Sequence, residues 1–176
     1  MQAKLTSLRI VLNDASILID LISLELISSF FSLDIEAHTV VDTINELNNH
    51  QRAIINAYRA VNKLMVHNIE DSQRTNIYKI AYPAGLCNND KAVIYLAVQL
   101  GAKLLSVEKI VRRFAASNAI PEHGMFWIFD QLVHERLLSH LVATEKIKRL
   151  VTSNFIYNSN GEILYEMNKR IKAWSS

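Results

Sequence analysis

The sequence predicts an α/β protein, a three-layer α/β/α sandwich around a central, mainly parallel sheet of four to five strands. Short apolar runs of strand-like composition alternate with longer segments of helical periodicity, which is typical of parallel sheets covered by helices. Acidic residues follow several of these runs, at the positions where such sheets present their ligands. The chain has 176 residues, of which 50% are hydrophobic, so it is long enough to bury a sizeable core.

The first half of the chain contains three predicted strands. They are residues 8–13, which are apolar and in part β-branched, and residues 36–41 and 63–69. The predicted helices of this half are residues 16–31, 42–50, 51–61 and a segment that ends near Tyr82. Asp71 or Ser72 is the expected N-cap of the last of these helices.

The most apolar stretch, residues 15–35, is expected to be a helix that faces the core. Asp20 and Glu25 interrupt it, whereas a membrane span needs about 20 nearly uninterrupted apolar residues. We therefore expect no membrane partner.

The clearest helix of the chain is predicted over residues 88–100, with Asn89 as its N-cap and Gly101 at its end. A fourth strand is expected at residues 103–106, followed by a helix that ends near Asn118. No strand signal follows Pro121, and the last helices are predicted at residues 124–136, 139–152 and 161–173. We expect one domain over residues 1–176, with an α/β core at about 1–120 and a C-terminal helical extension at about 121–176 that packs on it.

The composition indicates a cytoplasmic protein. Cys87 is the only cysteine, which excludes an internal disulfide and suits a reducing compartment, and we expect it to be a small apolar loop residue. The N-terminus shows no basic region followed by an apolar stretch and a cleavage site. The net charge of +2 neither requires nor excludes nucleic acid as a partner.

Four acidic residues, Asp14, Glu46, Asp90 and Glu108, lie at predicted junctions between strands and helices. Acids that reach the carboxyl edge of a parallel sheet from separate segments can converge on a hard divalent cation. Such a cation activates water and neutralises phosphate charge, as phosphodiester cleavage requires. Each acid taken alone would be equally suited to a helix cap or a solvated surface.

Taken in order, these segments resemble a PIN domain. The resemblance is carried by LRIVLNDASILIDL, by VVDTINEL and most strongly by NDKAVIYLAVQLGAKLLSVEKIVRRFA, in which an acid opens a helix and a second acid follows a short strand. The stretch IPEHGMFWIFDQLVHERLLS is similar to the tail of one bacterial and archaeal subgroup. The resemblance covers about residues 8–173, and it rests on the order of the motifs and not on any one of them.

The resemblance implies a Mg²⁺- or Mn²⁺-dependent endoribonuclease that acts on RNA. It also implies a toxin of a toxin–antitoxin pair, with an antitoxin protein as a partner, and a homodimer. By position, the residues implied to bind the metal and to act in catalysis are Asp14, Glu46, Asp90 and Glu108. We expect Ser16 and Ser106 to support these carboxylates through hydrogen bonds.

The basic residues Lys109, Arg112 and Arg113 follow the fourth acid and are candidates for contact with RNA phosphates, although a solvated helix face would explain them too. The chain departs from the family pattern at Ser106-Val107-Glu108, where an Asp is usual in the last position. This departure favours an alternative function, a catalytically weakened PIN-like nucleic-acid-binding or protein-interaction module. A small-molecule phosphatase is a third hypothesis, disfavoured because position 16 is Ser where one common type of phosphatase has Asp.

Overall fold

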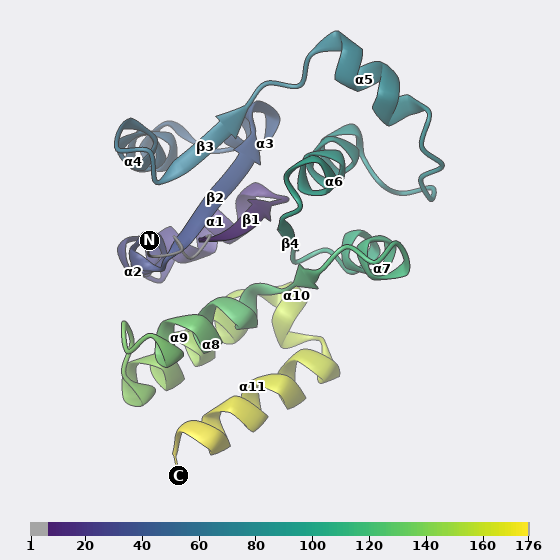
Figure 1. Ribbon diagram of the computed structural model, residues 1–176. Helices are drawn as coiled ribbons and strands as arrows, with labels where there is room; N and C mark the ends of the chain where they lie inside the picture. The colour runs from purple at the N-terminus through teal and green to yellow at the C-terminus, as the bar shows by residue number, and fades with distance from the viewer. Residues whose placement is uncertain (1–6, 176) are drawn as a thin grey trace, which may run out of the picture. The chain divides into compact units, whose positions relative to one another are not determined.

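The computed structural model describes residues 7–175, and its central element is a five-stranded sheet in which all neighbouring strands are parallel (Figure 1). The strands lie in the order β3-β2-β1-β4-β5. Their bounds are β1 Leu8–Leu12, β2 Ile35–Val40, β3 Leu64–His67, β4 Lys103–Leu105 and β5 Glu122–His123. The predicted parallel α/β class is confirmed, and the first four strands match the predicted ones.

The helices that flank the sheet and continue beyond it account for most of the remaining described residues. They are α1 Ala15–Ser23, α2 Ile27–Ser32, α3 Val41–Asn45, α4 Asn49–Ala60, α5 Asp71–Tyr78, α6 Asn88–Leu100, α7 Lys109–Ser117, α8 Met125–His134, α9 His140–Ser153, α10 Phe155–Asn158 and α11 Gly161–Trp174. In the part of the chain that the structure describes, no helix has the length and apolar character needed to cross a membrane.

The chain forms two compact units. The first comprises the described residues up to Ile19 together with residues 34–124, and it contains the whole sheet. The second comprises residues 20–33 and the described residues from Met125 onward, and it is helical. That the helical unit packs on the sheet as part of one domain stays a prediction.

The expectation that no strand follows Pro121 is wrong, because β5 pairs with β4 at the edge of the sheet. Leu104 N donates to Pro121 O at 2.8 Å, and Ser106 N donates to His123 O at 3.0 Å. A strand of two residues is too short to show an alternating pattern, so no sequence signal predicts it.

The continuous helix predicted over residues 16–31 is also wrong, because the chain breaks between α1 and α2. Glu25 has a φ of 59°, in the left-handed region. Leu26 N donates to Leu21 O at 2.8 Å, and Glu25 N donates to Ile22 O at 3.0 Å. These two bonds around a left-handed residue form a Schellman motif, which ends a helix. Glycine usually occupies the left-handed position, so a glutamate there does not predict the break.

The main core cluster of the first unit lies between the sheet and helices α6 and α7. Val11 of β1 and Leu104 of β4 pack with Val93 of α6 and with Val111 of α7, and all four are fully buried. Leu12 points to the opposite face of the sheet, since successive side chains of a strand alternate, and it is also fully buried. The central strand is therefore covered on both faces, as a three-layer arrangement requires.

The register of the strands brings their carboxyl ends to one edge. Leu12 is paired with Leu105, and Asn13 N donates to Leu105 O at 2.9 Å just beyond the strands. Thr39 near the end of β2 donates through Oγ1 to Leu12 O at 2.9 Å. The segments that follow β1, β2 and β4 therefore emerge close to one another.

Helix α6 ends at Gly101, whose φ of 58° lies in the left-handed region. We expect Gly101→Ala to lower the free energy of unfolding by about 1 kcal/mol, because a side chain strains this backbone conformation. A Cβ at this position would meet no atom within 4 Å, so the loss would come from the backbone alone.

Gly161→Ala is the matched control for denaturant unfolding. A Cβ would meet no atom within 4 Å there either, but Gly161 has no positive φ and opens α11, where alanine favours the helix. Equal losses in the two variants would contradict the assignment of strain to Gly101.

Candidate acidic site at the carboxyl edge of the sheet

Asp14 follows β1 and leads into α1, so its carboxylate lies at the carboxyl edge of the central strand. Asp14 Oδ1 accepts hydrogen bonds from Ser16 N, at 2.9 Å, and from Ser16 Oγ. Asp14 Oδ2 is buried and has no hydrogen-bond partner among the described residues. Leaving a buried carboxylate oxygen without a partner is costly, so this atom is suited to a bound water or a cation.

Asp90 lies in the first turn of α6 and is 3% exposed. Both of its carboxylate oxygens accept hydrogen bonds from other residues of the chain. Oδ1 accepts from Asn13 Nδ2 at 3.1 Å, and Oδ2 accepts from Cys87 N at 2.8 Å. Asn13 Oδ1 is left buried without a partner among the described residues. Asp90 is thus fixed by the residue that follows β1 and by the N-cap residue of α6.

The N-cap of α6 is Cys87 and not the predicted Asn89. Cys87 Sγ accepts from Asp90 N at 3.4 Å, and the two residues form a reciprocal capping box. Cys87 lies in the loop before α6, as expected, and its sulfur also caps that helix. The helix spans the predicted residues 88–100, but its N-cap lies two residues earlier than predicted, and the side chain of Asn89 donates to Glu46 and Thr43 instead.

Glu46 lies at the C-terminus of α3, and hydrogen bonds of amide and hydroxyl groups connect it to α6 and to the end of β1. Asn89 Nδ2 donates to Glu46 Oε1 at 3.3 Å and to Thr43 Oγ1 at 3.2 Å. Thr43 Oγ1 in turn donates to Asn13 O at 3.2 Å. Sequence reasoning missed Asn13, Thr43 and Asn89 as site residues, although each lies within three positions of a predicted acid.

Glu108 is the N-cap residue of α7, and Ser106 positions the turn before it. Glu108 N donates to Ser106 Oγ at 3.1 Å, and Ser106 is fully buried. Burial raises the pKa of Glu108, and the charges of Asp90, Asp14 and Glu46 raise it further. The fourth predicted acid therefore lies in the electric field of the other three.

The pKa of Glu46 is raised in the same way, first by desolvation and then by the charges of Asp14 and Asp90. The structure thus brings all four predicted acids into one cluster of mutually repelling carboxylates, which we call the acidic site. Carboxylates gathered in this way favour a cation, because it removes their repulsion.

The three predicted phosphate-binding residues lie on α7 in different surroundings. Arg112 turns toward β5, where its Nη1 lies 3.9 Å from Glu122 Oε2. Arg113 is exposed and lines a groove on the other side of the helix, and Lys109 is exposed in the first turn beside Glu108. Their contact with RNA stays a prediction.

The donor set of the acidic site suits Mg²⁺ or Mn²⁺, which prefer carboxylate oxygens. Within residues 7–175, no group of three or more His, Cys, Asp or Glu side chains is placed so that it could hold a metal ion by itself. Mg²⁺ commonly takes only one or two carboxylates and completes its shell with water and substrate phosphate. The unpartnered Asp14 Oδ2 fits that arrangement.

Comparison with known proteins identifies one family. A family model described as a PIN domain matches residues 10–169, a range that extends from β1 into α11 and includes the four acids. A search of curated proteins finds no match.

Proposed function

The chain belongs to the PIN-domain family, and on that premise we propose that it is a Mg²⁺- or Mn²⁺-dependent endoribonuclease. PIN domains are generally nucleases. The observation that supports the proposal most is the acidic site itself, in which Asp14, Glu46, Asp90 and Glu108 share one electric field at the carboxyl edge of the sheet.

Asp14 and Asp90 would hold the cation most directly, and Glu46 and Glu108 would complete its surroundings. A bound divalent ion supplies an activated water and neutralises charge on the phosphate. Ser16 donates to Asp14 Oδ1, and Asp14 Oδ2 is buried without a competing donor among the described residues.

Glu46 is the best candidate for the general base. Its raised pKa brings it nearer to the operating pH, where a carboxylate accepts a proton more effectively. The hydrogen bond from Asn89 orients its carboxylate, and an oxygen of that group would take the proton from the attacking water. Asn89 is therefore a positioning residue in this mechanism.

The proposed substrate is single-stranded or loop RNA, whose backbone and bases are accessible. The similarity of the C-terminal stretch to a toxin-type subgroup supports a role as the toxin of a toxin–antitoxin pair in the cytoplasm, with an antitoxin protein as partner and a homodimer as the assembly.

A second function is favoured by a specific observation. Both oxygens of Asp90 are already hydrogen-bonded within the chain, and a longer Glu108 occupies the position where the family usually has Asp. A protein with such a site would bind nucleic acid or a protein partner and cleave slowly or not at all.

A cleavage assay separates the two functions. The purified protein is incubated with a fluorescently labelled single-stranded RNA in Mg²⁺, in Mn²⁺ or in EDTA. The endoribonuclease proposal predicts internal cleavage that requires the metal. Retention of RNA on the protein without cleavage in either metal would support the weakened module.

A further inference from the structure

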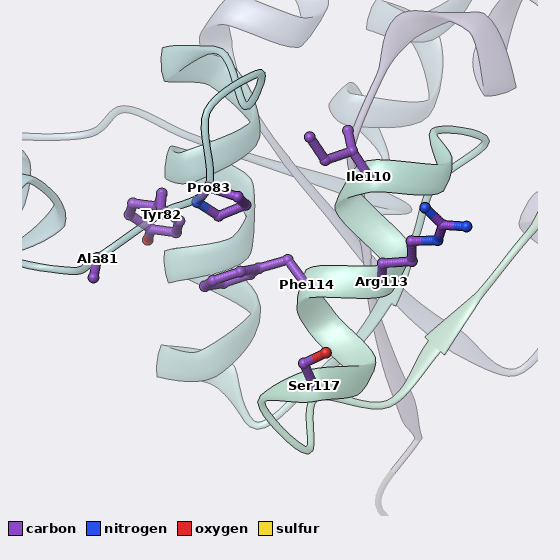
Figure 2. A pocket seen from close by; sticks show the side chains of 7 residues that line it. All are labelled: Ala81, Tyr82, Pro83, Ile110, Arg113, Phe114 and Ser117. Carbon is purple, nitrogen blue, oxygen red and sulfur yellow. The ribbon is translucent and has the colours of Figure 1, made fainter.

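An open groove of about 560 Å³ lies in the first unit, between α7 and the segment that leads from α5 to α6 (Figure 2). The residues that form it are mostly apolar, with a guanidinium and a hydroxyl at the margin. They include Tyr82, Pro83, Ile110, Arg113, Phe114 and Ser117. Nothing in the chemistry proposed for the acidic site uses this groove.

Two aromatic rings form the core of the groove. The rings of Tyr82 and Phe114 have centroids 5.1 Å apart and planes at 41°, so neither covers the face of the other completely. Figure 2 shows Phe114 extending from α7 toward Pro83 and Tyr82. Tyr82 Oη donates to Lys91 O at 3.4 Å, which fixes that ring against α6. The rings are therefore preorganised and still partly exposed.

Both segments that form the groove lead along the chain to residues of the acidic site. The wall that carries Tyr82 ends at Cys87, whose N–H binds Asp90. The other wall is α7, which begins directly after Glu108. Phe114 lies six residues beyond Glu108, or about 9 Å along the helix. A nucleic-acid strand whose phosphate lies at the acidic site can therefore place a neighbouring base at Phe114.

The charge around the groove is positive and complements a nucleic-acid backbone. Arg113 of α7 lines the groove itself, whereas Arg112 turns toward Glu122 of β5. Lys91 Nζ lies 5.9 Å from the centroid of the Tyr82 ring. Aromatic faces beside a cationic strip are the combination that binds single strands, through base stacking and phosphate contact.

We propose that this groove binds a base of single-stranded RNA that flanks the nucleotide held at the acidic site. The base stacks on Phe114 and Tyr82, and Arg113 contacts the adjoining phosphate. The inference rests on the proposed RNA-cleaving function and adds to it a subsite that holds the strand beside the acids.

The test is the affinity for a short fluorescein-labelled single-stranded RNA of mixed sequence, measured by anisotropy in EDTA so that the RNA stays intact. Phe114→Leu keeps apolar volume but removes the aromatic face, and it should weaken binding about tenfold. Tyr82→Leu is a second variant and should act in the same direction. Tyr78→Leu is the matched control, because Tyr78 is 71% exposed at the end of α5 and does not line the groove.

The outcomes separate this inference from the proposed function. Unchanged affinity in well-folded Phe114→Leu and Tyr82→Leu would overturn the subsite and leave the groove to a protein segment, even if the wild type cleaves RNA. No RNA binding by the wild type would overturn it as well. Binding that depends on Phe114, in a wild type that never cleaves, would uphold the subsite and refute the nuclease.

Discussion

Asp14→Asn is expected to reduce metal-dependent RNA cleavage by at least about 100-fold, since even the partners that support metal ligands carry effects of about 10–100-fold. The replacement is isosteric, and the amide oxygen can still accept from Ser16 N, as the carboxylate does at 2.9 Å. What it removes is the negative charge at the buried Oδ2, the atom that has no other partner among the described residues. Initial rates of cleavage in Mn²⁺ provide the measurement.

Asp71→Asn is the control for the same chemical change. Asp71 is exposed in the first turn of α5 and lies outside the acidic site, so its variant should cleave at the wild-type rate. A wild-type rate for Asp14→Asn would refute the assignment of Asp14 as a metal ligand.

The second large expected effect is on the pH dependence of the free energy of unfolding, and it arises from two histidines on neighbouring strands. His38 Nδ1 and His67 Nε2 lie 3.0 Å apart and share a hydrogen bond between β2 and β3. His38 Nε2 is buried without a hydrogen-bond partner among the described residues, although Glu36 Oε2 lies 4.0 Å away. Burial and, to a smaller extent, the charge of His67 lower the pKa of His38 to about 4.

The free energy of unfolding should therefore fall as the pH falls from about 6.5 to about 4. In this window the unfolded chain binds a proton at residue 38, whereas the folded chain keeps a neutral imidazole, so acid favours the unfolded state. The full contribution is about 3 kcal/mol, since one pKa unit corresponds to about 1.4 kcal/mol. His38→Gln should flatten the dependence of stability on pH in this window.

The measurement is urea unfolding of the wild type and of His38→Gln across this pH window. The other titrating groups, including Glu46 and Glu108, remain in both proteins, so the difference in slope reports on His38. His50→Gln is the matched control, since His50 is exposed on α4 and its loss should leave the pH dependence unchanged. If His38→Gln keeps the wild-type slope, the buried neutral imidazole is not the cause of acid lability.

The sequence was sufficient for features that depend on local pattern. The runs that became β1 to β4 alternate along the chain with segments of helical periodicity, and the order of strands and helices follows from that alternation. Asp14 and Glu108 follow β1 and β4 closely, so their meeting at one edge required only a parallel sheet. The metal-binding role of the four acids stays a prediction.

The features that escaped prediction depend on contacts between distant residues. The hydrogen bond from Asn13 to Asp90 joins positions 77 apart and exists only because α6 starts beside the end of β1. The link from Asn89 to Glu46 spans 43 positions in the same way. The groove beside Phe114 needs a segment without regular structure to lie against α7, and no periodicity describes such a segment.

Binding of Mn²⁺ by calorimetry tests the central claim most directly, with the wild type compared with Asp14→Asn/Asp90→Asn. The acidic site predicts micromolar-range binding by the wild type and its loss in the folded double variant. A well-folded wild type that binds no Mn²⁺ would contradict the claim, and the four carboxylates would then belong to a PIN domain whose function lies in a surface for partners.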